Sequence, residues 1–325
     1  MTPAARRRLG ATDLQVFPLN LGGNVFGWTT DRAQSFAVLD AYREAGGNFV
    51  DTADVYSNWV AGHRGGESEE ILGAWMRARG CRDEMIVATK VGMGGPDGSG
   101  PGLSAEQVRR GCEGSLRRLG VERLDLFYAH RDDPATPLDE TLTAFDRLVR
   151  EGKVRVLGAS NHAPDRLDQA LRSSATRRLA SYEVIQPPYN LVDRGTLEGP
   201  LAELCAERGL GVCTYCALAS GFLSGKYPGP RAGGARSASV QRHLDDPAAM
   251  RTLERARKVA RRHGVTVAQV ALAWQLHRPL VTTPIVSATT AAQVRELVGA
   301  LDVRLDADDM AALEARGGAR APAPP

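Results

Sequence analysis

The 325-residue sequence lacks the features that mark several specialised classes of protein. Its longest weakly polar stretch, residues 210–223, is too short and too polar to cross a bilayer. Three arginines lie near the N-terminus, but no apolar segment follows them as in an export signal. The 41 basic and 38 acidic residues nearly cancel, and no basic block could follow a phosphate backbone. We therefore expect a cytoplasmic protein with neither a membrane nor a nucleic-acid partner.

Cysteine is also scarce. Five cysteines, an odd number in a chain of this length, predict free buried thiols in a reducing compartment. Cys213 and Cys216 form a C-x-x-C, but residues three apart in a strand point to opposite faces about 10 Å apart. No second C-x-x-C or nearby His pair completes a metal site. We expect no metal.

The hydrophobic content of 43% is enough to build a large core. Short apolar segments alternate with amphipathic helical patterns, which indicates βαβ units and a parallel sheet. The predicted strands are residues 16–22, 48–52, 85–90, 125–130, 154–160, 182–186, 211–215 and 281–286. The predicted helices are residues 31–45, 68–79, 104–119, 138–150, 164–171, 196–208, 249–262 and 266–276, with one more from residue 290.

This alternation predicts an α/β protein with a single-domain (β/α)8 TIM barrel over residues 1–317. No G-x-G-x-x-G follows the first strand, which disfavours a dinucleotide-binding open sheet. Asp31, Ser68 and Ser104 are expected to cap helices. Residues 226–248 form a long loop suited to binding or disorder, and the Pro/Ala-rich tail 318–325 is expected to be disordered.

Polar residues end most of the predicted strands. In such a barrel the active site lies at the carboxyl ends of the strands, so these side chains should converge. They are Asp51, Lys90, His130, Ser160 with Asn161, Gln186, Tyr215 and, after the last strand, Ser287. A lysine at the end of an apolar strand is costly unless its ammonium meets a carboxylate or a ligand.

One group of polar residues could act together in proton transfer: Asp51, Lys90 and His130 with Tyr56. A tyrosine has a pKa of about 10, and a nearby ammonium such as Lys90 is expected to lower it. Asp51 would hold Lys90 charged, while His130 could bind the carbonyl oxygen that Tyr56 protonates. This set suits hydride delivery to a carbonyl carbon with proton transfer to its oxygen.

Several spaced motifs, in order over nearly the whole chain, resemble the aldo-keto reductase superfamily, in particular bacterial aldo/keto reductases and the branch with channel β subunits. They are FVDTADVY from Phe49, VATKVG from Val87, DLFYAH from Asp125, GASNH from Gly158, VIQPPYN from Val184, SGFLSGKY from Ser220 and TPIVSATTAAQV from Thr283. The resemblance implies a (β/α)8 barrel and an NAD(P)H-dependent carbonyl reductase. Tyr56 would be the general acid, and Asp51, Lys90 and His130 would complete the tetrad.

The resemblance also implies a cofactor site. Ser160, Asn161 and Gln186 would bind the nicotinamide carboxamide, Tyr215 would stack on its ring, and Gly22, Gly23, Asn24 and Asp51 would border it. Cys216, Ala217, Leu218, Ser220, Gly225 and Lys226 would hold the pyrophosphate, and Ser287, Thr289, Gln293 and Glu296 would line the adenosine end.

The motifs leave two nicotinamide cofactors open, NADPH and NADH. Many relatives have a basic residue at or beside Thr289, which meets the 2′-phosphate of NADP, and an Asn in place of Leu297. Lys226, Arg231 and Arg236 could supply the phosphate contacts instead. We expect NADPH, with NADH as the alternative.

Trp28 and Trp59 follow the first two strands and could wall a pocket for a small planar or apolar carbonyl substrate beside Tyr56 and His130, although ordinary loop packing explains them equally well. Two other functions stay open. One is a cofactor-sensing regulator with little turnover, and the other is an aldolase that uses Lys90 as a Schiff-base amine. The sequence specifies neither the physiological substrate nor the oligomeric state.

Overall fold

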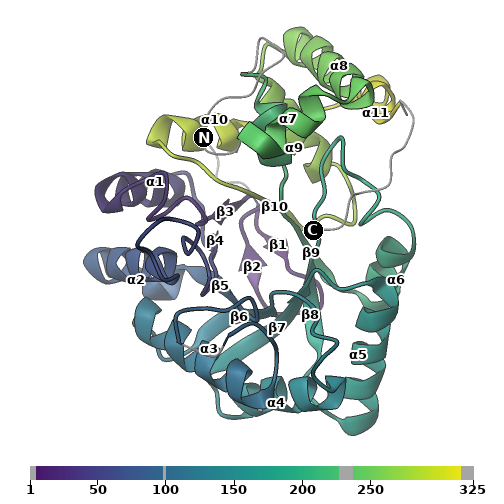
Figure 1. Ribbon diagram of the computed structural model, residues 1–325. Coiled ribbons are helices and arrows are strands. Elements are labelled where there is room, and N and C mark those ends of the chain that lie inside the picture. Colours follow the sequence, from purple (N-terminus) through teal and green to yellow (C-terminus); the bar gives the residue numbers. More distant parts are fainter. Residues whose placement is uncertain (1–4, 98–99, 227–236, 316–325) are drawn as a thin grey trace.

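The computed structural model describes residues 5–97, 100–226 and 237–315, in which eight parallel strands close into a barrel (Figure 1). The strands follow chain order around the barrel, and the last pairs with the first. They are β3 (Asn20–Gly22), β4 (Phe49–Asp51), β5 (Ile86–Val91), β6 (Leu124–Ala129), β7 (Val154–Ser160), β8 (Tyr182–Gln186), β9 (Gly211–Thr214) and β10 (Thr283–Val286). The predicted TIM barrel is confirmed, and each of its strands overlaps a predicted strand. The predicted strand 16–22 is divided, because Val16 belongs to the separate strand β2 (Gln15–Val16) and only Asn20–Gly22 enter the barrel.

Helices surround the barrel. Consecutive helices pack on one another from α1 to α6 and from α8 to α10, and α1 packs against α10 where the ring closes. They are α1 (Arg32–Glu44), α2 (Glu67–Arg79), α3 (Ala105–Leu119), α4 (Leu138–Arg150), α5 (Pro164–Arg177), α6 (Pro200–Arg208), α8 (Pro247–His263), α9 (Val267–Leu276) and α10 (Ala291–Val298). Helix α5 runs six residues beyond its predicted end at residue 171, and α6 begins at residue 200 rather than 196. Pro200 explains the second difference, because proline favours the first turn of a helix.

Two helices were not predicted, α7 (Ser237–Leu244) and α11 (Ala307–Glu314). Both pack on α8, outside the ring and towards the top of Figure 1. Helix α7 corrects part of the expected loop 226–248, while residues 227–236 lie outside the described residues. The predicted tail also falls outside them. The 3-10 segments are η1 (Arg82–Glu84), η2 (Ala219–Ser224) and η3 (Gly299–Asp302).

An antiparallel hairpin of β1 (Arg7–Arg8) and β2 (Gln15–Val16) covers the amino ends of the barrel strands. Its apolar side chains, including Leu9 and Leu14, belong to the same buried cluster as Phe49 inside the barrel. The Arg7 guanidinium donates hydrogen bonds to two carbonyls just before β10. The hairpin closes the end opposite the predicted active site. Strands of two residues are too short to show the alternation by which strands are predicted.

Two of the three predicted helix caps are confirmed. Asp31 and Ser104 each accept a hydrogen bond from the third helical residue in a capping box. The prediction for Ser68 is wrong, because Gly66 is the N-cap of α2 and Ser68 lies inside its first turn. Ser68 is fully buried, and its hydroxyl binds the loop after β3 rather than the helix end.

The cysteines are few, and their environments differ. Cys81, Cys112, Cys205 and Cys213 are buried free thiols, but Cys216 is exposed. The expectation that every cysteine is buried is therefore wrong at Cys216, which follows the end of β9. No helix among the described residues has the length and apolarity needed to cross a membrane.

Candidate active site

The alternation of side chains along the strands brings the polar set together at one end of the barrel. A residue two positions beyond an interior side chain also faces the interior. The buried interior cluster includes Phe49, Ala88, Tyr128, Val184, Cys213 and Ile285, and two positions further along the chain stand Asp51, Lys90, His130, Gln186, Tyr215 and Ser287. Each of these six follows an interior residue at the carboxyl end of its strand. The strand register, which pairs Gly22 with Asp51 and Ser160 with Gln186, aligns these ends.

Lys90 is at the centre of this set and is completely buried. Its ammonium donates to Asp51 Oδ1 at 2.5 Å, to the Thr52 carbonyl at 2.8 Å and to Tyr56 Oη at 2.8 Å. These three bonds use all three ammonium hydrogens. Burial lowers the pKa of Lys90, and the Asp51 carboxylate opposes that effect. A buried lysine is tolerated when it is paired and fully hydrogen-bonded in this way.

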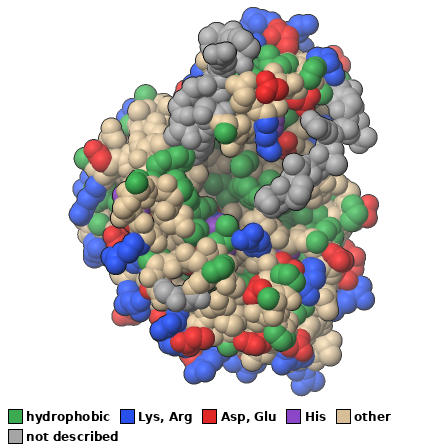
Figure 2. Space-filling view, in the orientation of Figure 1, with side chains coloured by type: hydrophobic (Ala, Val, Ile, Leu, Met, Phe, Trp, Pro, Cys, Tyr) green, Lys and Arg blue, Asp and Glu red, His purple; other side chains and the backbone are tan. Residues whose placement is uncertain are grey.

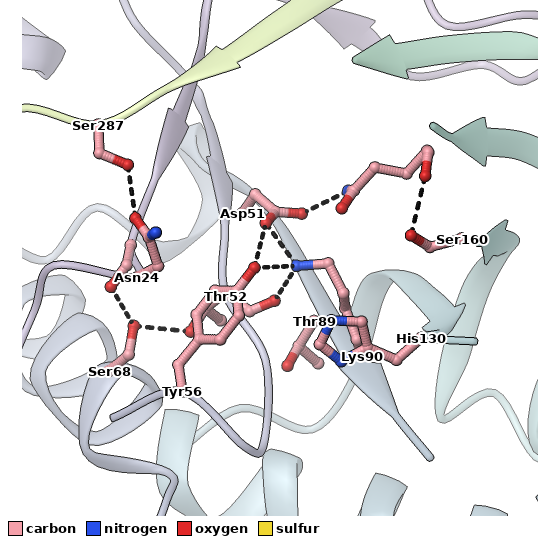
Figure 3. Close-up of polar contacts among 12 residues, drawn as sticks. Asn24, Asp51, Thr52, Tyr56, Ser68, Thr89, Lys90, His130, Ser160 and Ser287 are labelled. Carbon is pink, nitrogen blue, oxygen red and sulfur yellow. Dashed lines mark hydrogen bonds and ion pairs between the residues drawn. The ribbon is translucent and has the colours of Figure 1, made fainter. Parts of the chain in front are cut away.

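Tyr56 places its hydroxyl between Lys90 and Asp51, 3.3 Å from Asp51 Oδ1 (Figure 3). Burial of the phenol, followed by the Asp51 charge, raises the pKa of Tyr56 well above its usual value. The net pKa is therefore raised and not lowered as expected, because burial and the Asp51 charge set the direction of the shift. Tyr56 holds its proton at neutral pH.

His130 lies beside Tyr56, with 6.1 Å between the ring centroids. Burial, followed by the charges of Lys90 and Arg131, lowers the pKa of His130 well below its usual value. The imidazole is therefore neutral at physiological pH. Within the described part of the chain its Nδ1 has no hydrogen-bond partner. A neutral imidazole carries one N–H that can be donated to a ligand.

The predicted nicotinamide residues lie together on the other side of Asp51. Gln186 Nε2 donates to Asp51 Oδ2 at 2.8 Å, and Ser160 Oγ donates to the Gln186 carbonyl at 2.8 Å. Asn161 has a left-handed backbone with φ 53°, which Asn tolerates better than most residues. Its side chain accepts a hydrogen bond from Tyr215 Oη at 2.7 Å. Amide and hydroxyl groups therefore surround a position beside the tetrad.

The turn after β3 borders the same mouth. The Gly23 amide donates to the Asp51 carbonyl at 2.7 Å, and Asn24 Oδ1 accepts a hydrogen bond from Ser287 Oγ at 2.6 Å (Figure 3). A Cβ on Gly23 would lie 2.9 Å from Ser68 Oγ, closer than real Cβ atoms approach. Only glycine fits this close approach.

The residues expected at the pyrophosphate follow β9. Cys216, Ala219 and Ser220 all have positive φ angles, and Gly225 ends η2 with φ 73°. Lys226 is exposed. Ala217 and Leu218, which are also expected here, lie between Cys216 and Ala219 in the sequence. Arg231 and Arg236 lie outside the described residues.

The residues expected at the adenosine end lie at α10. The Thr289 amide and hydroxyl both donate to Gln293 Oε1, at 2.8 and 3.0 Å, so they form a local pair. Glu296 is exposed on the same helix, and Leu297 is buried in the core.

Aromatic side chains line the mouth next to Tyr56. Trp59 packs edge-on against Tyr56 at 6.0 Å and against Trp28 at 5.5 Å between ring centroids. Trp59 is 48% exposed, which is unusual for so large an apolar side chain. Figure 2 shows a hollow over the barrel that is lined mainly by hydrophobic side chains. Trp28 and Trp59 therefore pack together beside Tyr56 at this end of the barrel.

Several groups close to the tetrad were not predicted. Thr52 Oγ1 donates to Ser68 Oγ at 2.7 Å, and Thr89 Oγ1 donates to Glu69 Oε1 at 2.5 Å. Asp54 is buried nearby, where burial and the Glu69 charge raise its pKa to about 8. These two hydrogen bonds join residues 16 and 20 positions apart, a separation that carries no sequence signal. In the described residues no group of three or more His, Cys, Asp or Glu is placed to hold a metal ion.

Comparison with known proteins gives one consistent family. The model of the Aldo/keto reductase family matches residues 18–316. The chain is 36% identical over 308 residues to the uncharacterized oxidoreductase YrpG of Bacillus subtilis, which covers 92% of this chain and 91% of that protein. It is 35% identical over 306 residues to a probable voltage-gated potassium channel subunit beta of Oryza sativa, with 91% of each chain covered. An aldo-keto reductase of Strobilurus tenacellus is 32% identical over 287 residues, covering 86% of this chain and 80% of that protein.

Proposed function

The chain belongs to the aldo/keto reductase family of oxidoreductases, and from that premise we propose that it reduces aldehydes or ketones to alcohols with a reduced nicotinamide cofactor. One observation carries the proposal. The protonated Tyr56 hydroxyl lies 2.8 Å from a buried Lys90 ammonium that Asp51 neutralises. An acid and a cation placed together at the mouth of a barrel suit proton transfer to a developing alkoxide.

Each tetrad residue then has a distinct role. When bound, the reduced nicotinamide supplies a hydride to the carbonyl carbon. Tyr56 donates its phenolic proton to the carbonyl oxygen, and solvent later returns a proton to Tyr56. The Lys90 ammonium stabilises the phenolate that forms, because it is 2.8 Å from that oxygen, and Asp51 keeps Lys90 charged. Neutral His130 donates a hydrogen bond that orients the carbonyl group.

The chain's own residues fit a nicotinamide group. Ser160, Asn161 and Gln186 offer the amide and hydroxyl groups that pair with a carboxamide, and the Tyr215 ring is tied to Asn161 beside them. The αL backbone at Cys216, before η2, and at Ser220, within η2, suits an anion held by main-chain amides, as expected of the pyrophosphate segment. Gly22 and Asn24 border the nicotinamide position, and Thr289, Gln293 and Glu296 would line the adenosine end.

We propose NADPH as the preferred cofactor. Lys226 is exposed at the end of the pyrophosphate segment and can meet a phosphate, and Arg236 would assist it. NADH is the alternative, because Thr289 is uncharged and bound to Gln293. The apolar wall of Trp28 and Trp59 favours a substrate with an apolar or planar group beyond its carbonyl.

The decisive experiment replaces the proposed acid. Tyr56→Phe removes one hydroxyl, and we expect kcat on a panel of aldehydes to fall by roughly 100-fold or more. The Kd of NADPH, followed by fluorescence titration, should stay nearly unchanged. Tyr42→Phe is the matched control, because Tyr42 donates to the Leu19 carbonyl in the core and should affect stability alone. Undiminished turnover by Tyr56→Phe would contradict the proposed role.

A second candidate function is a cofactor-binding regulatory subunit with slow turnover. Its support is the 35% identity to the rice protein described as a probable potassium channel subunit beta. Tight NADPH binding without turnover of any carbonyl compound in the panel would favour this candidate over the reductase. Turnover that Tyr56→Phe abolishes would favour the reductase.

We also propose that the barrel, residues 1–317, acts as one domain followed by the Pro/Ala-rich tail 318–325. The buried free thiols Cys81, Cys112, Cys205 and Cys213 suit a reducing compartment, which supports a cytoplasmic location.

A further inference from the structure

A short chain of buried hydroxyl groups connects the proposed catalytic lysine to the turn after β3. Lys90 Nζ donates to the Thr52 carbonyl at 2.8 Å, and Thr52 Oγ1 donates to Ser68 Oγ at 2.7 Å. Ser68 Oγ in turn donates to the Gly23 carbonyl at 2.8 Å (Figure 3). Thr52 and Ser68 are both completely buried. Each hydroxyl in the chain is therefore directed by another protein group and not by solvent.

We propose that Thr52 and Ser68 are positioning residues: their hydroxyls fix the Thr52 carbonyl that holds the Lys90 ammonium, and tie it to the Gly23 turn on the cofactor side. This inference rests on the proposed function, because it assigns Lys90 to the reaction. Neither residue touches the reacting atoms, so both act through Lys90.

The Thr52 carbonyl differs in kind from the other two acceptors of the Lys90 ammonium. Two of the three Lys90 hydrogen bonds go to Asp51 and Tyr56, both of which share in the reaction. The Thr52 carbonyl is the only one of the three acceptors that is a backbone group, so it anchors the ammonium while negative charge develops on Tyr56. Thr52 is held on its other side by its own amide, which donates to the Ala88 carbonyl at 2.8 Å.

Helix α2 holds both strands of the site through consecutive residues of its first turn. Ser68 binds Thr52 at the end of β4, and Glu69 accepts from Thr89, the residue before Lys90 on β5. Glu69 is itself fixed by Arg118 Nε at 2.6 Å. The helix therefore sets the distance between the Thr52 carbonyl and Lys90 from both sides.

The two hydroxyls have separable effects on the site. Removing the Thr52 hydroxyl frees the carbonyl that faces Lys90 and leaves the Ser68 bond to Gly23 in place. Removing the Ser68 hydroxyl frees both Thr52 and the Gly23 turn. The first change should therefore act on the proton-transfer step, and the second should also weaken cofactor binding.

The test compares Thr52→Val, which keeps the shape but loses the hydroxyl, with Thr52→Ser, which keeps the hydroxyl. We expect Thr52→Val to lower kcat on an aromatic aldehyde with NADPH by about ten-fold, the effect of weakening one hydrogen bond to a charged group. The alkaline limb of its kcat/KM profile should move to lower pH by roughly half a unit, because a less well bound ammonium loses its proton more easily. Thr52→Ser should behave like the parent in both measurements.

Several ionisable groups surround Lys90 and contribute to the pH profile. They are Asp51 and Asp54 on and after β4, Tyr56 in the following loop, Glu69 on α2 and His130 after β6. Thr52→Val alters none of them directly. Thr141→Val is the control for simple loss of stability, since it removes a buried hydroxyl that donates to the Leu103 carbonyl at 2.9 Å, outside the site. It should lower the Tm without moving the pH profile.

If Thr52→Val does not fold, Ser68→Ala tests the same chain of hydroxyls, and it should lower kcat, move the alkaline limb in the same direction and raise the Kd of NADPH. Equal kcat and pH profiles for the parent, Thr52→Val and Ser68→Ala would overturn the inference. The proposed function is tested separately, because it fails when Tyr56→Phe keeps full turnover or when the parent turns over none of the carbonyl compounds.

Discussion

At the residue scale, the site combines a buried pair of charges that compensate one another with a buried carboxyl group that stays protonated. Lys90 and Asp51 are both buried and satisfy each other at 2.5 Å. Asp54, two positions before Tyr56, has a buried Oδ1 without a hydrogen-bond partner among the described residues. Burial and the Glu69 charge raise its pKa to about 8, so the carboxyl is neutral over most of the physiological range.

This shift predicts a pH-dependent stability. In the unfolded chain the pKa of an Asp is about 4, whereas the pKa of Asp54 in the folded protein is about 8. Between these two pH values the folded protein therefore holds a proton that the unfolded chain has lost. The contribution of Asp54 to stability therefore declines as the pH rises through this window. Asp54→Asn cannot ionise, and its Tm relative to the parent should increase from pH 5 to pH 8 in thermal unfolding.

Asp40→Asn is the contrasting variant. The Arg79 hydrogen bond lowers the pKa of Asp40, which stays ionised throughout the same window. Its Tm difference from the parent should be constant with pH. Parallel loss of stability by the parent and by Asp54→Asn between pH 5 and pH 8 would contradict the shifted pKa.

At the element scale, the barrel interior depends on pairing a large residue with a small one across neighbouring strands. Tyr128 on β6 faces Gly158 on β7, its partner in the strand register. A Cβ at Gly158 would overlap the Tyr128 ring. Tyr128 can therefore lie inside the barrel, one layer below the tetrad, only because β7 has no side chain there.

Gly158→Ala should therefore destabilise the protein by roughly 1–3 kcal/mol through overpacking, measured as a shift in denaturant or thermal unfolding. Combining it with Tyr128→Leu, which removes the ring, should recover part of the loss. In a double-mutant cycle the two changes should not be additive, since they share one contact. Strictly additive losses would show that the ring and the glycine do not compete for the same space.

At the scale of the whole molecule, the proposed cofactor site draws on segments from most of the chain. Gly23 follows β3, Asn161 follows β7, Tyr215 follows β9 and Thr289 follows β10. A ligand bound across all of them should stabilise the closed barrel and not a single element. At a concentration of about 100 times its Kd, a ligand that binds only the folded state adds about 2.7 kcal/mol to its stability.

NADPH should therefore raise the Tm by several degrees, and by more than NADH at equal concentration. Lys226→Met should reduce the difference between the two cofactors, because it removes a cation proposed to meet phosphate. Lys258→Met, an exposed lysine on α8, is the matched control and should leave both shifts unchanged. A larger shift with NADH would contradict the proposed preference.

Sequence reasoning identified all eight barrel strands and the residues at their ends, because both follow from local alternation and chain order. It also placed Asp51, Lys90, His130 and Gln186 at one mouth, where the structure brings them together. The N-terminal hairpin, α7 and α11 were missed, since such short elements carry little periodic signal.

The tertiary structure decided what depends on burial and on contacts between distant segments. The direction of the Tyr56 pKa shift follows from the desolvation of the phenol beside Asp51, which no sequence pattern reports. Ser68 has the residue type of a helix cap, but its place in the first turn of α2 directs its hydroxyl towards Thr52 and Gly23, which follow β4 and β3. The sequence determined which groups reach the mouth of the barrel, because strand alternation is local. Their protonation states and their supporting contacts were decided only by the closed barrel, because desolvation and close packing are properties of the assembled fold.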